Sequence, residues 1–110
     1  MRTRGTRGEN IACDFLLKQG LKMRVRNYRT AFGEIDLIMQ ENNVIVFVEV
    51  KYRKSLKFGN PLESVGWHKQ QKIKSIARIY LAQLGYEPLC RFDVIGILDK
   101  RIYWVKGAFT

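Results

Sequence analysis

Hydrophobic residues recur at helical spacing in two segments of the chain. The first segment covers about residues 7–19 and is followed by Gly20, a common helix stop signal. Thr6 and Glu9 have the spacing of a capping box at its start. The second segment follows Pro61 and ends near Gly85. Its apolar stripe consists of Ile73, Ile76, Ala77, Tyr80, Leu81 and Leu84. The pattern therefore predicts two helices.

The remaining segments alternate or run continuously apolar, as strands do. LKMRVRNYRT places Met23 and Val25 on one side and arginines on the other, which predicts a first strand with one wet face. GEIDLIM and VIVFVEVKYR flank the polar sequence QENN and predict a hairpin. The second arm begins apolar on both faces, as expected of a central strand. RFDVIGIL and RIYWVKG predict two further strands that turn at Asp99 and Lys100.

The order of these elements is α-β-β-β-α-β-β, which predicts an α/β fold with a central mixed sheet flanked by helices. The second helix should make a right-handed crossover, leaving the third and fourth strands parallel. A chain of 110 residues is long enough for one hydrophobic core and too short for two. We therefore expect residues 1–110 to form a single domain.

Charged residues interrupt the predicted hairpin at one place. If the hairpin closes symmetrically on QENN, Glu34 lies opposite Glu49 and Asp36 lies opposite Phe47. Because side chains alternate between the faces of a sheet, these three acids and Lys51 then project from one face. A slip of one residue would send Asp36 to the other face, so the cluster depends on the register.

Crowded carboxylates repel one another, and a divalent cation is the counterion that best neutralises them. Oxygen ligands suit Mg²⁺ or Mn²⁺, which leave other positions to water and substrate phosphate. Such an ion favours phosphodiester hydrolysis, in which Lys51 would orient the attacking water or stabilise developing negative charge. The alternatives are structural: Glu49 and Lys51 as a cross-strand ion pair at a strand end, Asp36 as a turn-proximal acid, and Glu34 as the partner of an arginine.

The start of the second helix can add to this cluster. Continuing its apolar stripe backward from Ile73 reaches Gln70 and Lys69, so both side chains should point toward the sheet. They are candidate accessory residues. The alternative for Lys69 is a stem that covers apolar surface while its ammonium group reaches water.

The charge balance indicates a polyanionic partner. Twenty basic residues against ten acidic ones give a net charge of +10, which favours nucleic acid over a membrane. Tyr28, Tyr52 and Phe58 are interleaved among the basic residues and are candidates for base stacking or core packing. The candidate phosphate contacts are Arg4, Arg7, Arg29, Arg53, Lys54 and Lys57.

Other classes of protein are disfavoured by composition. No apolar run approaches a membrane span, and the N-terminal residues lack a secretory apolar region, so a cytoplasmic location is expected. Cys13, Cys90 and His68 do not have the spacing of a zinc site or a disulfide framework.

These motifs also carry a resemblance. GEID followed by VFVEVK resembles the PD-(D/E)XK nuclease superfamily, and RGEN on the first helix is similar to archaeal Holliday-junction resolvases. RGEN, NYR, GEIDLI, VFVEVKYR, RFDVIG and the terminal AF together resemble the bacterial YraN family over nearly the whole chain. The resemblance implies a restriction-endonuclease-like core with catalytic Asp36, Glu49 and Lys51. It also implies Glu9 as an additional metal ligand, and a homodimer as in the resolvases. The superfamily's proline before its aspartate is replaced here by Ile35.

Residues and resemblance together predict a Mg²⁺- or Mn²⁺-dependent DNA endonuclease, acting on branched or junction DNA. Two other hypotheses stay open at this point. One is a nucleic-acid-binding module that keeps the fold without cutting, and the other is a protein-interaction subunit of a larger assembly.

Overall fold

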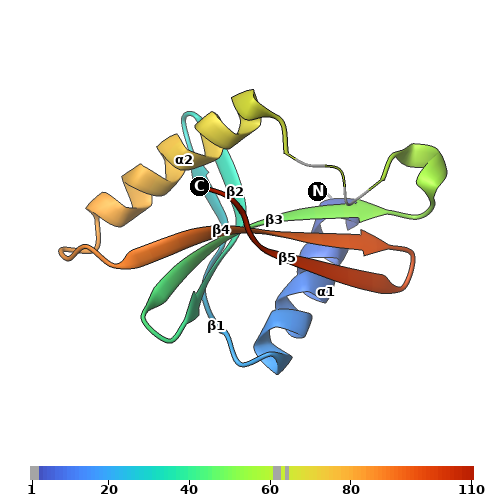
Figure 1. Cartoon of the computed structure of the whole chain (residues 1–110), viewed down its shortest axis with the longest axis horizontal. Coiled ribbons are helices and arrows are strands. Elements are labelled where there is room, and N and C mark those ends of the chain that lie inside the picture. Colours follow the sequence, from blue (N-terminus) through green and yellow to red (C-terminus); the bar gives the residue numbers. More distant parts are fainter. Residues whose placement is uncertain (1–2, 61–62, 64) are drawn as a thin grey trace.

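The computed structural model describes residues 3–60, 63 and 65–110, except the side chains of residues 3–6 and 58. Their elements are α1 (Thr3–Lys18), β1 (Lys22–Thr30), β2 (Gly33–Glu41), β3 (Val44–Arg53), the 3-10 turn η1 (Leu56–Phe58), α2 (Trp67–Ala82), β4 (Leu89–Leu98) and β5 (Arg101–Phe109). The predicted order α-β-β-β-α-β-β is thus confirmed (Figure 1). None of the helices described is long and apolar enough to cross a membrane.

One mixed sheet organises these elements, with the strands in the order β1-β2-β3-β4-β5. Strands β3 and β4 are parallel, with Val44 beside Leu89 and Arg53 beside Leu98. The other neighbouring pairs are antiparallel. The sequence predicted both the parallel pair and the central place of β3, because a helical crossover has to return the chain to the same end of the sheet.

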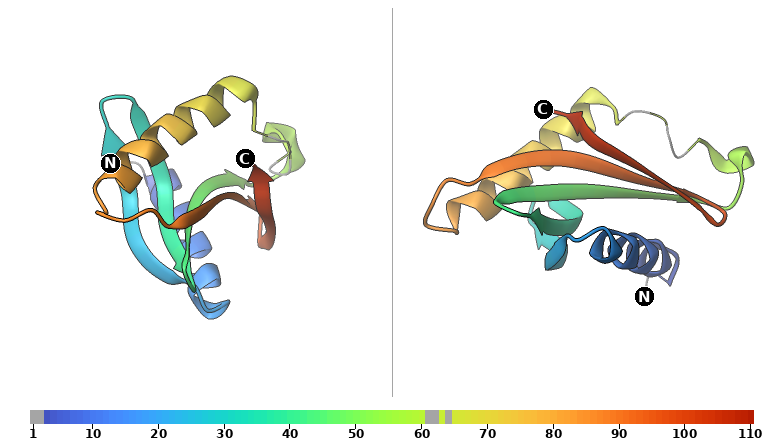
Figure 2. Two further views of the ribbon diagram at one scale, coloured as in Figure 1. Left: turned by 60° about the vertical axis from the view of Figure 1, so that its left-hand side comes forward. Right: turned by 60° about the horizontal axis from the view of Figure 1, so that its bottom comes forward.

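The two helices cover opposite faces of the sheet (Figure 2). On the α2 side, Ile73, Ile76 and Tyr80 pack against Ile38 and Phe47. On the α1 side, the buried set is Ala12, Cys13, Leu16, Leu21, Leu37, Met39, Val46, Val48, Ile95 and Ile97. Strand β3 contributes to both cores, which explains why both of its parities are apolar at the start.

Helix α1 begins earlier than the pattern predicted. Thr6 lies inside the helix rather than at its N-cap, so the predicted capping box is wrong. Gly8 lies within this helix and has a packing reason. A Cβ atom at Gly8 would lie 3.1 Å from Cβ of Tyr52 on β3. The glycine thus permits a close approach of helix and strand, a tertiary effect that outweighs its low helix propensity.

The β2–β3 hairpin closes two residues away from the predicted register. Its turn is Asn42–Asn43 rather than all of QENN, with Asn42 at φ 54°, a left-handed conformation that asparagine tolerates. Leu37 pairs with Val48 and Glu41 with Val44, so the predicted pairings of Glu34 with Glu49 and of Asp36 with Phe47 are wrong. A shift of two residues preserves the side-chain faces, so Glu49 still belongs to the face covered by α2.

Strand β1 also departs from strict alternation. A bulge between Met23 and Val25 leaves Met23 45% exposed, whereas Val25 packs into the core on the α2 side. The two residues were expected on the same buried face. An extra residue in one strand moves the side chains before it to the opposite face of the sheet. The sequence pattern alone does not reveal such a bulge.

Candidate active site

Asp36 lies where the regular ladder of β2 breaks. Ile35 and Ile38 both pack in the core on the α2 side, although strict alternation would place them on opposite faces. The pairs between β2 and β3 run only as far as Leu37 with Val48. Beyond that pair, the Oδ2 atom of Asp36 accepts a hydrogen bond from the backbone N–H of Val50 at 2.8 Å. The carboxylate thus occupies the end of the hairpin ladder and is held against β3.

Asp36 and Glu49 form a carboxyl pair at this point. A hydrogen bond joins the two side chains, and the Glu49 side chain is 12% exposed. Burial, followed by the repulsion and the hydrogen bond from Glu49, raises the pKa of Asp36 to about 8. At neutral pH the metal-free pair therefore shares a proton. Two acids from neighbouring strands do converge, as the parity of the hairpin predicted.

Two lysines surround the carboxyl pair. Nζ of Lys69, from the first turn of α2, lies 3.5 Å from Oε2 of Glu49. Nζ of Lys51 donates to the backbone oxygen of Glu63 at 2.5 Å and also interacts electrostatically with Glu49 and Lys69. Burial lowers the pKa of Lys51, although Glu49 opposes the shift. The site therefore combines two carboxyl groups with two ammonium groups over the α2 face of the sheet.

The two residues predicted at the start of α2 have different roles in the structure. Lys69 reaches Glu49, as just described. Gln70 instead donates from Nε2 to the backbone oxygen of Val65 at 2.7 Å, while its own N–H donates to the oxygen of Gly66. Gln70 therefore fixes the chain as it enters the helix that carries Lys69.

The other two predicted acids lie elsewhere. Oε2 of Glu34 on β2 lies 3.1 Å from Nε of Arg29 on the neighbouring strand β1, and the two form an ion pair. This pairing matches the structural alternative for Glu34. Glu9 is 4% exposed on α1, the helix that covers the opposite face from α2. Within residues 3–60, 63 and 65–110, no three His, Cys, Asp or Glu side chains are grouped so that they could hold a metal ion. Glu9 as a ligand stays a prediction.

The residues predicted to contact phosphate differ in exposure and in the partners of their charged groups. Arg7, Lys54 and Lys57 are exposed, and Arg29 is held by Glu34. Arg53 donates from Nη1 to the oxygen of Tyr52. The side chain of Arg4 lies outside the described residues. Strand β3 ends at Arg53, two residues after Lys51, and Lys54 and Lys57 follow it in the chain.

Two of the aromatic candidates for base stacking belong to the core. Tyr28 packs edge-on against Tyr80, with ring centroids 5.3 Å apart. Tyr52 packs in the core on the α1 side, beneath Gly8. The side chain of the third candidate, Phe58, is outside the described residues. Phe32 is 64% exposed at the turn between β1 and β2 and was not singled out from the sequence.

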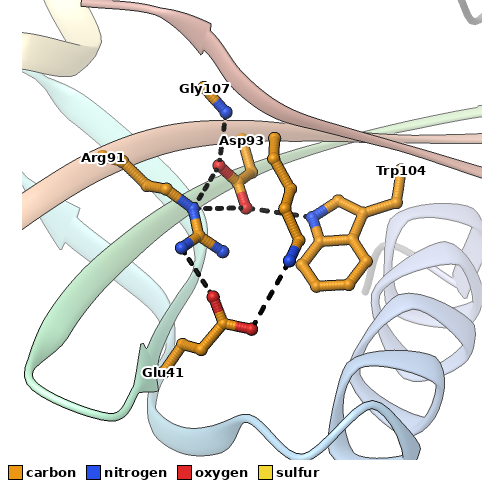
Figure 3. Close-up of polar contacts among 6 residues, drawn as sticks. Glu41, Arg91, Asp93, Trp104 and Gly107 are labelled. Carbon is orange, nitrogen blue, oxygen red and sulfur yellow. Dashed lines mark hydrogen bonds and ion pairs between the residues drawn. The ribbon is translucent and has the colours of Figure 1, made fainter.

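A second polar cluster joins β2, β4 and β5 (Figure 3). The side chain of Asp93 is fully buried; its Oδ1 and Oδ2 accept from Nε of Arg91 at 3.0 and 3.2 Å. Asp93 also accepts from Nε1 of Trp104 and from the N–H of Gly107, both at 2.9 Å. Nη1 of Arg91 also forms an ion pair with Oε1 of Glu41, at 2.6 Å.

The Asp93 cluster has a structural role that the sequence did not suggest. The pairing of β4 with β5 shifts between Phe92 and Val94, and Gly107 adopts φ 60° opposite this bulge. The N–H of Gly107, displaced from the regular ladder, is taken by Asp93. The motif RFD, with two charges on one side of a strand that is otherwise apolar, is the signal that could have found this cluster.

Comparison with known proteins places the chain in a family. The model of the family described as "Uncharacterised protein family UPF0102" matches residues 8–97. The UPF0102 protein of Thermodesulfovibrio yellowstonii is 50% identical over 105 residues, covering 96% of this chain and 94% of the relative. That of Caldicellulosiruptor bescii is 52% identical over 113 residues, covering 96% and 95%. That of Janthinobacterium sp. is 45% identical over 104 residues, covering 94% and 85%. The chain belongs to the UPF0102 family, the family of the YraN proteins.

Proposed function

We propose that the protein is a metal-dependent endonuclease that hydrolyses phosphodiester bonds in DNA, with branched or junction DNA as the structure on which it acts. The observation that carries the proposal is the contact between the carboxyl groups of Asp36 and Glu49, buried beside Lys51 and Lys69. Clustered groups with perturbed pKa values and opposite charges are typical of catalytic sites.

The carboxyl pair fits a hard divalent cation. Its donor atoms are oxygens, and burial together with repulsion from Glu49 raises the pKa of Asp36 although Lys69 opposes the shift. Mg²⁺ and Mn²⁺ typically take one or two protein carboxylates and leave their other positions to water and phosphate. Asp36 and Glu49 would hold the ion, and Glu9 would join them only if it turned toward this face. When bound, the ion supplies Lewis-acid polarisation of the phosphate and a more acidic water.

The protein's own side chains then have distinct tasks. Asp36 and Glu49 lose the shared proton when both become ligands, and the N–H of Val50 keeps Asp36 oriented toward β3. Lys51, with its lowered pKa, orients the attacking water or stabilises the negative charge that develops on the phosphate. Lys69 neutralises Glu49 before substrate arrives and can turn toward a phosphate oxygen afterwards.

The positive charge of the chain supports a polyanionic substrate. The net charge of +10 favours rapid, salt-dependent association with nucleic acid. Lys54 and Lys57 are exposed and extend the positive charge beyond the end of β3, the strand that carries Lys51. Phosphate contacts of this kind position the backbone and carry no sequence information, so selectivity for DNA structure is favoured over selectivity for sequence.

Cleavage of a panel of branched, duplex and single-stranded DNA with Mn²⁺ tests the proposal. We expect Glu49→Gln and Lys51→Ala each to reduce cleavage by at least about 10²-fold, because the first removes a proposed metal ligand and the second a charge at the reacting phosphate. DNA binding measured by fluorescence anisotropy should change little. Glu87→Gln, at an exposed position before β4, is the control for loss of one acid. Binding without cleavage by the wild type on every substrate would instead support the non-catalytic module.

A further inference from the structure

The turn between β1 and β2 forms an open groove next to the proposed active site. The groove has a volume of about 390 Å³ and is lined by Arg29, Thr30, Gly33 and Glu34. In Figure 1 this turn lies beside α2, the helix that also supplies Lys69. Glu34 lies two residues before Asp36 on the same strand, so the groove and the carboxyl pair are neighbouring sites along β2.

Lys72 lies against Gly33, one of the residues that line this groove, because Gly33 has no side chain. A Cβ atom at Gly33 would lie 3.1 Å from Cε and 3.7 Å from Nζ of Lys72, and Gly33 has φ 132°. The lysine stem therefore crosses directly over the glycine. Lys72 follows Lys69 by three residues, which places both on neighbouring positions of one side of α2. The helix thus carries positive charge from the carboxyl pair to the turn.

The turn that forms this groove also presents an exposed aromatic ring. Phe32 is 64% exposed, whereas Tyr28 on the same hairpin is half-buried in the core. The backbone that carries Phe32 is held in place by Thr30, whose hydroxyl donates to the oxygen of Gly33 and accepts from the N–H of Phe32, both at 3.1 Å. A large exposed apolar ring on a fixed turn is a candidate for stacking on an unpaired base.

We propose that this groove is a subsite for an unpaired stretch of the DNA strand that continues past the cleaved bond. Lys72 and Arg29 contact its phosphates, and Phe32 stacks on one of its bases. The proposal rests on the nuclease function, which defines the part of the strand that continues past the cleaved bond. It names the substrate class as DNA with single-stranded character next to the scissile phosphate.

The spacing along β2 agrees with a continuous strand. Two strand residues span about 7 Å, so the groove and the carboxyl pair are close enough for one DNA strand to contact both. The ion pair between Arg29 and Glu34 is no obstacle, because Arg29 is 66% exposed and its guanidinium has further donors for a phosphate. Glu34 then keeps Arg29 positioned at the wall of the groove.

Binding without cleavage tests this subsite separately from the chemistry. We would measure fluorescence anisotropy in EDTA with two DNA hairpins, one blunt and one with a single-stranded tail. Phe32→Ala should weaken binding of the tailed hairpin by roughly 5- to 100-fold and leave the blunt one unchanged, since one stacked base is lost. Lys72→Ala should lower the salt dependence by about one phosphate contact. Lys18→Ala, an exposed charge in the last turn of α1, is the matched control.

The outcomes separate the subsite from the nuclease function. Equal effects of Phe32→Ala on both hairpins, or no effect on either, would overturn the subsite. A Lys72→Ala variant with the salt dependence of Lys18→Ala would do the same. Loss of tailed binding in Phe32→Ala, in a protein that cuts nothing with Mn²⁺, would keep the subsite and remove the nuclease.

Discussion

Metal-free protein carrying Asp36→Asn should be more stable than the wild type at pH 9, and the advantage should vanish near pH 4. Burial and Glu49 raise the pKa of Asp36 to about 8 in the folded protein, well above its ordinary value of 3.8. The folded state therefore binds this proton more tightly than the unfolded state does. The stability that the proton contributes is complete below about pH 4 and is lost as pH rises to about 8.

The size of this effect follows from the interval between the two pKa values. Each pH unit in that interval costs the wild type about 1.4 kcal/mol of unfolding free energy, a cost that an uncharged asparagine avoids. Urea unfolding in EDTA between pH 4 and 9 measures the difference between the two proteins. Asp14→Asn, which removes the same charge from an exposed position on α1, controls for net charge. A difference that stays constant across this range would contradict the raised pKa.

The second large effect is expected at Asp93. Asp93→Ala should lower the free energy of unfolding by about 3–5 kcal/mol, the usual loss when one partner of a buried ion pair is removed. The variant leaves the Nε–H of Arg91, the indole N–H of Trp104 and the N–H of Gly107 without their acceptor. Because Gly107 sits at the bulge of β5, the edge strand should also lose protection from hydrogen exchange.

A milder variant keeps this prediction measurable if Asp93→Ala fails to fold. Asp93→Asn retains one acceptor oxygen and should lose less stability than alanine. Glu41→Gln, at the partly exposed end of the same cluster, should lose less still, because solvent screens this ion pair. Urea unfolding at pH 7 would rank the three variants. Equal stability of Asp93→Ala and Glu41→Gln would show that the buried carboxylate does not hold the strands together.

At the β2–β3 hairpin the arms and the side-chain faces were predictable from the sequence, but the register was not. The apolar spacing predicted both arms, and parity alone brought Asp36 and Glu49 to the same face. The register itself was wrong by two residues, because QENN can close as a four-residue loop or with only Asn42–Asn43 in the turn. Only an odd shift would have separated the two acids, which is why the site was predictable from an incorrect pairing.

Other features depended on tertiary contacts that no local pattern encodes. Helix α1 continues through Gly8 because Tyr52 packs against it. Phe32 is exposed on a turn that Thr30 holds in place, whereas Tyr28, four residues earlier, packs in the core against Tyr80. The Asp93 cluster requires the bulge opposite Gly107, and a bulge leaves no mark in the alternation of a short strand.

Titration of Mn²⁺ into the purified protein, followed by calorimetry, tests most directly whether Asp36 and Glu49 are ligands of a metal ion. We expect the wild type to bind one ion at this pair, with proton release near neutral pH as the shared proton leaves. Asp36→Asn and Glu49→Gln should each weaken binding by about 10-fold or more, as loss of one of two charged ligands implies. Glu87→Gln should bind like the wild type. Equal Mn²⁺ affinity in the wild type and both site variants would contradict the assignment of this carboxyl pair as the metal site.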